Sequence, residues 1–319
     1  MGKNVLNMPN LIDFIKNNKN IIFSSVAEEN RIKNILGKYN YLNIFSLKYL
    51  FGTGYKKIIL PNNKYRYEYI YKNQTKYKDI EKKYKELLKL ENKIREGVLM
   101  YETELKSHFI FFLHDFLTTE KIDFNTFLNN LVRYDVKTNQ NIRLITELGK
   151  ITDEWKRQTN DYSMDYDNYY DYYHLFIKIL SFGTLGRILD AHYHGDKVFK
   201  LFSNYLNRSN VFDIGKIYKN LMTIIILRNS LCHKESLIIF LEKGNKKNEM
   251  KRFELKQKGQ TLKENFLQFR INAIVKIYEY YMQREKKKMP IDCWVRNYSK
   301  YRLKNGQNGI KFNRIKINV

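Results

Sequence analysis

A short polar sequence, Arg228-Asn229-Ser230-Leu231-Cys232-His233, directly follows the apolar run Ile224-Ile225-Ile226-Leu227. It places a permanent cation, an amide and an imidazole within a turn and a half of an expected helix. An imidazole exchanges protons near neutral pH. A fixed guanidinium stabilises negative charge that builds on a phosphate oxygen. Cleavage of a phosphodiester without a metal ion requires groups of this kind.

The spacing of these residues decides which of them can act together. Five residues of an ideal helix turn by about 140°, so Arg228 and His233 do not share a face, whereas Asn229 and His233 do. The long guanidinium of Arg228 can still reach a group held beside His233. Leu227 and Leu231 lie four residues apart and can anchor the opposite side of the helix.

The chemistry that fits these groups is RNA cleavage by the ribose 2′-OH. A histidine can remove the proton of the 2′-OH or supply one to the leaving 5′-oxygen. Arg228 would bind the non-bridging phosphate oxygens, and Asn229 would orient the imidazole or a phosphate. We therefore expect no metal and no cofactor, and RNA rather than DNA as substrate. Because one histidine cannot easily be both base and acid, a twofold dimer is the simplest arrangement.

The Arg-x4-His spacing is weak evidence by itself, because it also occurs from Arg187 to His192. The structural alternative is an arginine that pairs with a carboxylate and a histidine that caps or packs a helix. Asn229 and the apolar run before Arg228 favour the functional interpretation of the first copy without deciding it.

The charge of the chain predicts a polyanionic partner. The 319 residues carry 58 Lys and Arg against 33 Asp and Glu, a net charge of +25, which raises affinity for nucleic acid. RNA is slightly favoured over DNA, and a membrane surface is the weaker alternative. The two cysteines form no disulfide framework, no apolar segment is long enough to cross a bilayer, and the N-terminus resembles no signal peptide. We expect a cytoplasmic protein without a membrane partner.

Apolar periodicity predicts a mainly all-α fold with a small β-hairpin. Short helices are expected between residues 10 and 50, and alternating tyrosines from Tyr65 to Tyr71 predict the hairpin. Other helices are expected over 80–113, over 124–158, from Leu175 to Gly183, over 213–239 and, after a capping box at Thr261, to about 286. Three parts are expected: 1–76 with the N-terminal helices and hairpin, 77–286 as a helical core with a basic insertion at 242–258, and 287–319 as a basic extension.

Several segments together resemble one known family. Arg-Asn-x-x-x-His at 228–233 is similar to the signature of HEPN ribonucleases, and specifically to that of the Abi-like abortive-infection family of AbiD/AbiF type. The other similar segments, in the order found in that family, are Tyr39-Asn40-Tyr41-Leu42-Asn43, Glu91-Asn92-Lys93-Ile94-Arg95, Tyr101-Glu102-Thr103-Glu104-Leu105-Lys106-Ser107 and Leu180-Ser181-Phe182-Gly183-Thr184-Leu185.

This resemblance implies a HEPN-type helical bundle, a homodimer and a metal-independent endoribonuclease used as a toxin in anti-phage defence. It also implies a small non-coding RNA that restrains the toxin. The catalytic residues would be Arg228, Asn229 and His233, whereas Arg187 and His192 lie outside the family's catalytic position. Cys232 and Lys234 stand where alanine and a second histidine are common in the family.

Other charged residues are candidates for supporting and binding roles. Glu102, together with Arg95 and Lys106 on the same long helix, is expected to orient Arg228, although a glutamate that pairs only with Lys106 is an equal alternative. Contact with RNA phosphates is expected from the basic insertion, where a merely solvated loop is the alternative. Its candidate residues are Lys246, Lys247, Lys251, Arg252 and Lys256.

Two other functional classes remain open at the level of sequence. One is a non-catalytic RNA-binding module with a HEPN fold, which would bind RNA with a steep dependence on salt and would not cleave it. The other is an interaction protein whose charge is incidental, which would purify free of nucleic acid.

Overall fold

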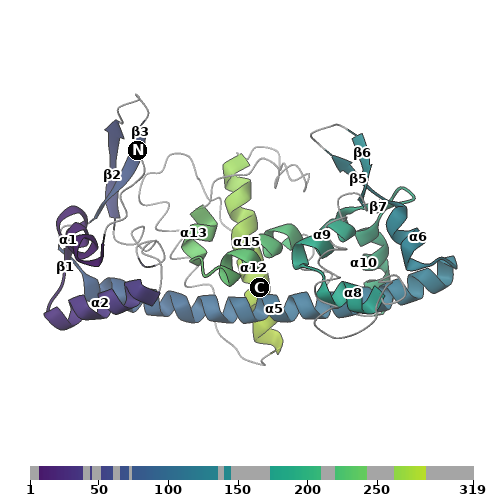
Figure 1. The fold of residues 1–319 in the computed structure, drawn as a ribbon, viewed down its shortest axis with the longest axis horizontal. Coiled ribbons are helices and arrows are strands. Elements are labelled where there is room, and N and C mark those ends of the chain that lie inside the picture. Colours follow the sequence, from purple (N-terminus) through teal and green to yellow (C-terminus); the bar gives the residue numbers. More distant parts are fainter. Residues whose placement is uncertain are drawn as a thin grey trace. The chain divides into compact units, whose positions relative to one another are not determined.

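The structure is a computed structural model. It describes residues 7–38, 44, 52–59, 65–71, 74–135, 140–144, 173–209, 220–242 and 262–284. The described part is mainly helical and contains small β-sheets (Figure 1). The predicted mainly-α fold class is therefore confirmed.

The chain divides into two compact units whose boundaries run through helices. The first unit contains residues 1–93, 230–271 and 288–319, and the second contains 94–229 and 272–287. Helices α5 (Tyr77–Glu120), α12 (Leu221–Cys232) and α15 (Leu262–Arg284) each contribute to both units. This division differs from the parts expected from the sequence, because no boundary falls where α5 begins.

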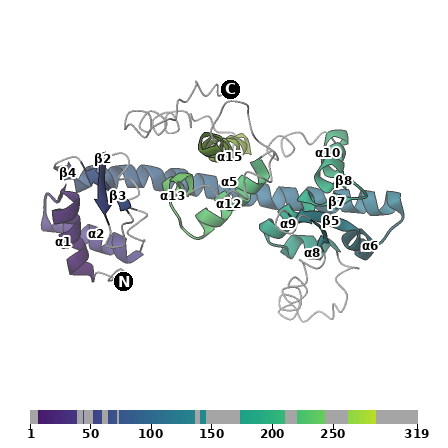
Figure 2. The ribbon, with the colours of Figure 1, turned by 90° about the horizontal axis from the view of Figure 1, so that it is seen from above.

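In the first unit, short elements lie beside the N-terminal part of α5 (Figure 2). Asn7 caps the first helix by accepting a hydrogen bond from the backbone N–H of Asn10 at 3.0 Å, which satisfies one of the free donors at a helix start. Its strands β1 and β4 pair in parallel. Its elements besides α5, α12 and α15 are α1 (Met8–Lys19), β1 (Ile21–Ile22), α2 (Val26–Lys38), β2 (Gly52–Ile59), β3 (Tyr65–Tyr71), β4 (Thr75–Lys76) and α13 (Leu237–Glu242).

The predicted hairpin is present in this unit. Strands β2 and β3 pair antiparallel, from Ile59 opposite Tyr65 at the turn to Gly52 opposite Tyr71 at the open end. The tyrosine alternation thus identified a strand correctly. The hydrophobic core of the unit is formed by apolar side chains of α1, α2 and α5, among them the fully buried Ile15, Ile32, Tyr77 and Ile80.

The second unit packs helices and a four-stranded sheet on the C-terminal part of α5 (Figure 1). The sheet has the strand order β6-β5-β7-β8, with antiparallel pairs throughout. The elements of this unit besides α5, α12 and α15 are α6 (Phe124–Asn129), β5 (Leu131–Asp135), β6 (Gln140–Arg143), α8 (Tyr173–Ile179), α9 (Phe182–Asp190), β7 (His192–Tyr193), β8 (Asp196–Lys197) and α10 (Val198–Arg208).

Aromatic side chains dominate the core of the second unit. Phe109 of α5 meets Phe202 of α10 edge to face with ring centroids 5.4 Å apart. Phe116 meets Tyr193 of β7 in the same way at 5.3 Å. Edge-to-face pairs of this kind add to the free energy gained by burying the rings. The apolar face of α5 therefore holds α10 and the sheet in place.

The prediction of helices over 124–158 is wrong for residues 131–135 and 140–143. Asp123 caps only a six-residue helix, α6, and strands β5 and β6 follow it. The apolar residues of this stretch also fit a helical rhythm, and short apolar runs do not distinguish the two structures. The strand forms because Leu131 and Val132 pair with Tyr193 and His192, about 60 residues further along the chain.

Two other predicted helices end earlier than expected. The helix beginning near Leu175 stops at Ile179, and Ser181 caps the next one by accepting a hydrogen bond from the N–H of Thr184. The helix carrying Arg228 ends at Cys232 rather than continuing to 239. The predicted C-terminal helix is present and begins at Leu262, directly after Thr261.

Helices α5 and α15 approach closely at Gly97 within the second unit. A Cβ atom on Gly97 would lie 2.9 Å from the Cβ of Tyr281 and 3.1 Å from the carbonyl oxygen of Ile277. The nearest of these atoms, the Cβ of Tyr281, is bonded directly to the backbone and cannot move aside unless the helix shifts. A glycine is therefore required at this crossing despite its low helix propensity.

We predict that Gly97→Ala lowers the free energy of unfolding by about 1–2 kcal/mol, because overpacking outweighs the gain in helix propensity. Gly37→Ala is the matched control: a Cβ atom added to Gly37 in α2 would have no neighbour within 4 Å, so it should stabilise by up to about 1 kcal/mol. Urea unfolding followed by circular dichroism measures both. An unfolding free energy for Gly97→Ala equal to or above that of the parent would contradict the close crossing.

Candidate functional site

Arg228 is held by a buried carboxylate of the long helix. Arg228 lies in the last turns of α12 and is half-buried, and its Nε donates a hydrogen bond to Oε2 of Glu102 at 3.0 Å. Glu102 lies on α5 and is only 6% exposed. Both residues belong to the second unit. The guanidinium is thus fixed by an ion pair between residues 126 positions apart.

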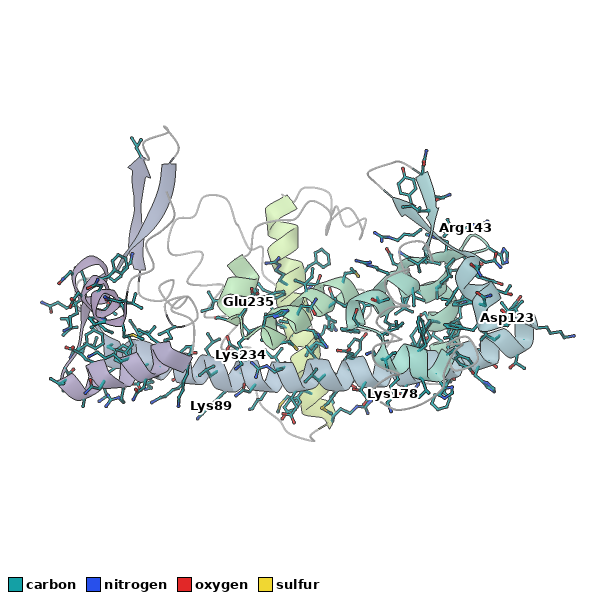
Figure 3. The ribbon with its side chains drawn as sticks, viewed as in Figure 1. Lys89, Asp123, Arg143, Lys178, Lys234 and Glu235 are labelled. Carbon is teal, nitrogen blue, oxygen red and sulfur yellow. The ribbon has the colours of Figure 1, made fainter. Side chains whose placement is uncertain are left out.

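Glu102 binds a second cation through its other oxygen. The Nζ of Lys106 lies 2.9 Å from Oε1 of Glu102, and the Lys106 side chain is 13% exposed. The same Nζ donates a hydrogen bond to the backbone carbonyl of Lys178 on α8 at 3.3 Å, and Figure 3 labels Lys178 beside α5. Each carboxylate oxygen therefore has a cationic partner, and the charge buried on Glu102 is compensated.

The geometry leaves donors of Arg228 available for an anion. A guanidinium has five N–H donors in a planar fork. Nε is directed at Glu102, and Nη1 lies 3.4 Å from Oδ1 of the exposed Asn229, a long hydrogen bond. Among the described residues, Nη2 has no hydrogen-bond partner. The group is therefore oriented on one side and can bind a phosphate oxygen with the other.

Tyr101, the neighbour of Glu102 in the chain, ties α5 to other helices of the second unit. Its ring meets Phe182 of α9 at 6.3 Å and Tyr280 of α15 at 5.7 Å, both edge to face. Burial raises the pKa of the Tyr101 hydroxyl well above its usual range. Tyr101 therefore stays neutral, and its two ring contacts position the helix turn that carries Glu102.

His233 lies in a fixed turn directly after α12, in the first unit. The N–H of Glu235 donates to the carbonyl of Ser230 at 2.8 Å, and the N–H of Lys234 donates to that of Leu231 at 3.1 Å. Lys234 adopts a left-handed φ of 56°. These features form a Schellman motif, in which His233 is the C-cap residue, and Figure 3 labels Lys234 and Glu235 at this turn. The imidazole is exposed to solvent.

A residue of α5 also caps the start of the next helix, α13. Glu91, a buried residue of the first unit, accepts a hydrogen bond at 2.8 Å from the backbone N–H of Leu237, the first residue of α13. A carboxylate at a helix start satisfies a free backbone donor. Glu91 therefore fixes the position of Leu237, at the end of the turn that contains His233.

Of the other residues singled out in the sequence, the structure describes some and leaves the basic insertion undescribed. Arg95 is half-buried on α5, within the second unit. The second Arg-x4-His pair does not lie on one helix, because Arg187 is on α9 and His192 is on β7, both exposed. The predicted RNA-binding residues Lys246, Lys247, Lys251, Arg252 and Lys256 lie outside the described residues.

The sequence did not reveal two contacts, one within each unit. The hydrogen bond from Lys106 to the carbonyl of Lys178 and the cap on Leu237 by Glu91 both join residues distant along the chain. The i, i+4 spacing of Glu102 and Lys106 predicted only the ion pair between those two residues. Within the described ranges, no three His, Cys, Asp or Glu side chains gather where they could bind a metal ion.

Comparison with protein families, with curated proteins and with solved structures found no match to this chain. Of the helices that the structure describes, none is both long and apolar enough to cross a lipid bilayer.

We predict that Glu102→Gln lowers the free energy of unfolding by about 1–3 kcal/mol, because it removes the negative charge that two partly buried cations share. Glu96→Gln is the control on the same helix. Glu96 is exposed, and its substitution should change stability by less than about 0.5 kcal/mol. Thermal unfolding of the two variants and the parent provides the measurement. Equal stability of all three proteins would show that the ion pairs of Glu102 contribute nothing to the free energy of unfolding.

Proposed function

We propose that the chain is a metal-independent endoribonuclease of HEPN type, used as an abortive-infection toxin against phage. The observation that supports this most is the orientation of Arg228 by the buried Glu102, with donors of the guanidinium left available. A surface arginine without such a partner would lose side-chain entropy on binding a phosphate, whereas a fixed one loses little. The Arg-Asn-x-x-x-His sequence supplies the other groups.

In the proposed reaction, the ribose 2′-oxygen attacks the adjacent phosphorus and the bond from phosphorus to the 5′-oxygen breaks. The 2′-OH proton passes to a neutral imidazole, and a protonated imidazole supplies the proton to the leaving 5′-oxygen. Arg228 binds the non-bridging oxygens as their charge increases. The products are a 2′,3′-cyclic phosphate and a 5′-hydroxyl. The exposed position of His233 is compatible with a long polymeric substrate.

Two proton transfers are required, and each chain supplies one histidine in the motif. We therefore propose a homodimer in which two copies of His233 serve one scissile phosphate, one as base and the other as acid. The net charge of +25 further supports a stable RNA partner that restrains the toxin. An RNA bound over the site would inhibit it by excluding substrate.

A non-catalytic RNA-binding module is the second candidate. The pairing of Arg228 with a buried carboxylate that also binds Lys106 is an arrangement that structural arginines adopt too. Under this alternative, Arg228 stabilises α12 on α5 and RNA binds without being cut.

We predict that His233→Ala lowers the rate of RNA cleavage by about 10²–10⁴-fold, because the proton carrier is lost. His233 is exposed, so the variant should fold like the parent. Arg228→Ala should give a loss of similar size, and its folding is checked separately because it leaves Glu102 with one cation fewer. Cleavage of a labelled RNA is followed with EDTA present.

The second Arg-x4-His pair gives the matched control variants. Arg187→Ala and His192→Ala remove the same residue types at the same spacing and should retain the cleavage rate of the parent within about threefold, a difference of less than 1 kcal/mol. If His233→Ala cleaves as fast as these controls, the assigned site is wrong. If the parent binds RNA but never cleaves it, the binding-module alternative holds.

A further inference from the structure

Four lysines form a straight row on the N-terminal part of α5. Lys78, Lys82, Lys85 and Lys89 are all exposed and follow one another at intervals of four, three and four residues. On a helix these positions fall within an arc of about 60° and extend over about 16 Å of its length. The whole row belongs to the first unit. Figure 3 labels Lys89 on the edge of α5 that points away from α13.

The acidic residues of the same stretch lie outside this row. Glu81 and Glu91 are buried: Glu81 pairs with Lys85 at 2.9 Å and with Arg31 of α2 at 3.7 Å, and Glu91 caps α13. Asp79 and Glu86 are exposed and lie about 60° and about 40° beyond the arc on one side. Glu86 pairs with Lys83 at 2.7 Å. Two of these four acidic residues are therefore buried, and the exposed Glu86 is paired with a lysine outside the row.

Three of the four lysines have no ion-pair partner in the part of the chain that the structure describes. Lys85 alone has one, Glu81, and its side chain is still 64% exposed. Among the described residues, no carboxylate lies within ion-pair distance of Lys78, Lys82 or Lys89. Neighbouring ammonium groups of the row, which are three or four residues apart, repel one another. An anion that binds along the row therefore removes an unfavourable interaction as well as forming new ones.

The opposite face of the helix is packed into the core, which makes the row rigid. Ile80, Tyr84 and Leu87 are each at most 2% exposed. The Cα positions of the lysines are thereby fixed, with axial steps of about 6, 4.5 and 6 Å. These steps are similar to the separation of neighbouring phosphates along a nucleic-acid strand.

We propose that this lysine row binds the phosphate backbone of RNA. Lysine contacts phosphates as a point charge and does not read bases in pairs of hydrogen bonds as arginine does. The row therefore contributes affinity and orientation and no base specificity. A membrane fits less well, since a helix that lies on a bilayer needs an apolar face for the lipid, and the apolar face of this helix is already buried in the protein.

RNA binding by the row does not depend on cleavage at Arg228 and His233. Its test is therefore carried out with the full chain bearing His233→Ala, which removes the proposed cleavage and leaves the row intact. A failure of the proposed ribonuclease activity would leave this test unaffected.

The experiment measures the dissociation constant of a fluorescein-labelled RNA hairpin by anisotropy over a range of KCl concentrations. The test variant is Lys78→Gln, Lys82→Gln and Lys89→Gln combined, which leaves the pair of Lys85 with Glu81 in place. Each lost phosphate contact lowers the slope of log affinity against log salt by about 0.7–0.9, so three should lower it by about 2 to 3. Affinity at low salt should fall at least tenfold.

The control variant removes three positive charges elsewhere: Lys16→Gln, Lys83→Gln and Lys200→Gln combined. Each of these lysines is already paired with a carboxylate, at 2.6, 2.7 and 3.0 Å respectively. Its salt slope should change by less than about one. Equal slopes for the row variant and the parent would overturn the proposal, as would an equal reduction in the control. A loss confined to binding of phosphatidylserine vesicles would also overturn it.

Discussion

The structure depends most on a single buried carboxylate. Glu102 is removed from water on the long helix α5 and has one cation on each oxygen, Arg228 and Lys106. Burial of an ionised carboxylate costs several kcal/mol even in a real protein, and only close, well-oriented partners offset that cost. If Arg228 moved away, one oxygen of the buried Glu102 carboxylate would therefore lose its cationic partner. This constraint converts a flexible side chain into a fixed one.

The turn after α12 is constrained by a small number of hydrogen bonds. The backbone hydrogen bonds of a Schellman motif end the helix at Cys232 and make His233 its cap. Lys234 adopts the left-handed conformation that glycine usually supplies, at a cost of about 1 kcal/mol. Glu91 then fixes the first residue of α13. His233 in this turn therefore has a fixed backbone conformation and an exposed imidazole ring.

Hydrophobic periodicity in the sequence predicted the helices and strands whose buried residues lie close together along the chain. The apolar rhythm from Ile80 to Leu113 identified α5, whose buried side chains repeat with the helical period. The alternating tyrosines identified β3. Strand β5 was missed because its pairing partner, β7, lies far along the chain. The end of α12 was missed because no glycine marks it.

The candidate site was predictable to a similar extent. The residue types and spacing of Arg228, Asn229 and His233 could be read directly, and so could the i, i+4 relation of Glu102 to Lys106. The contact of Glu102 with Arg228 was only one of two equal alternatives, because it joins two helices whose packing no local pattern determines. The lysine row on α5 was hidden by the general abundance of lysine, because the sequence does not show that Glu81 and Glu91 are buried while the four lysines are exposed.

We propose that the ribose 2′-OH of the substrate is the nucleophile and that Arg228 and His233 assist its attack. The most direct test is the chemical nature of the ends produced when the protein cleaves RNA in EDTA, determined by mass spectrometry. A 2′,3′-cyclic phosphate and a 5′-hydroxyl are predicted, together with complete resistance of an RNA that has a 2′-deoxy sugar at the cleaved position. Products with a 5′-phosphate, or cleavage of the 2′-deoxy substrate at an equal rate, would contradict attack by the ribose 2′-OH.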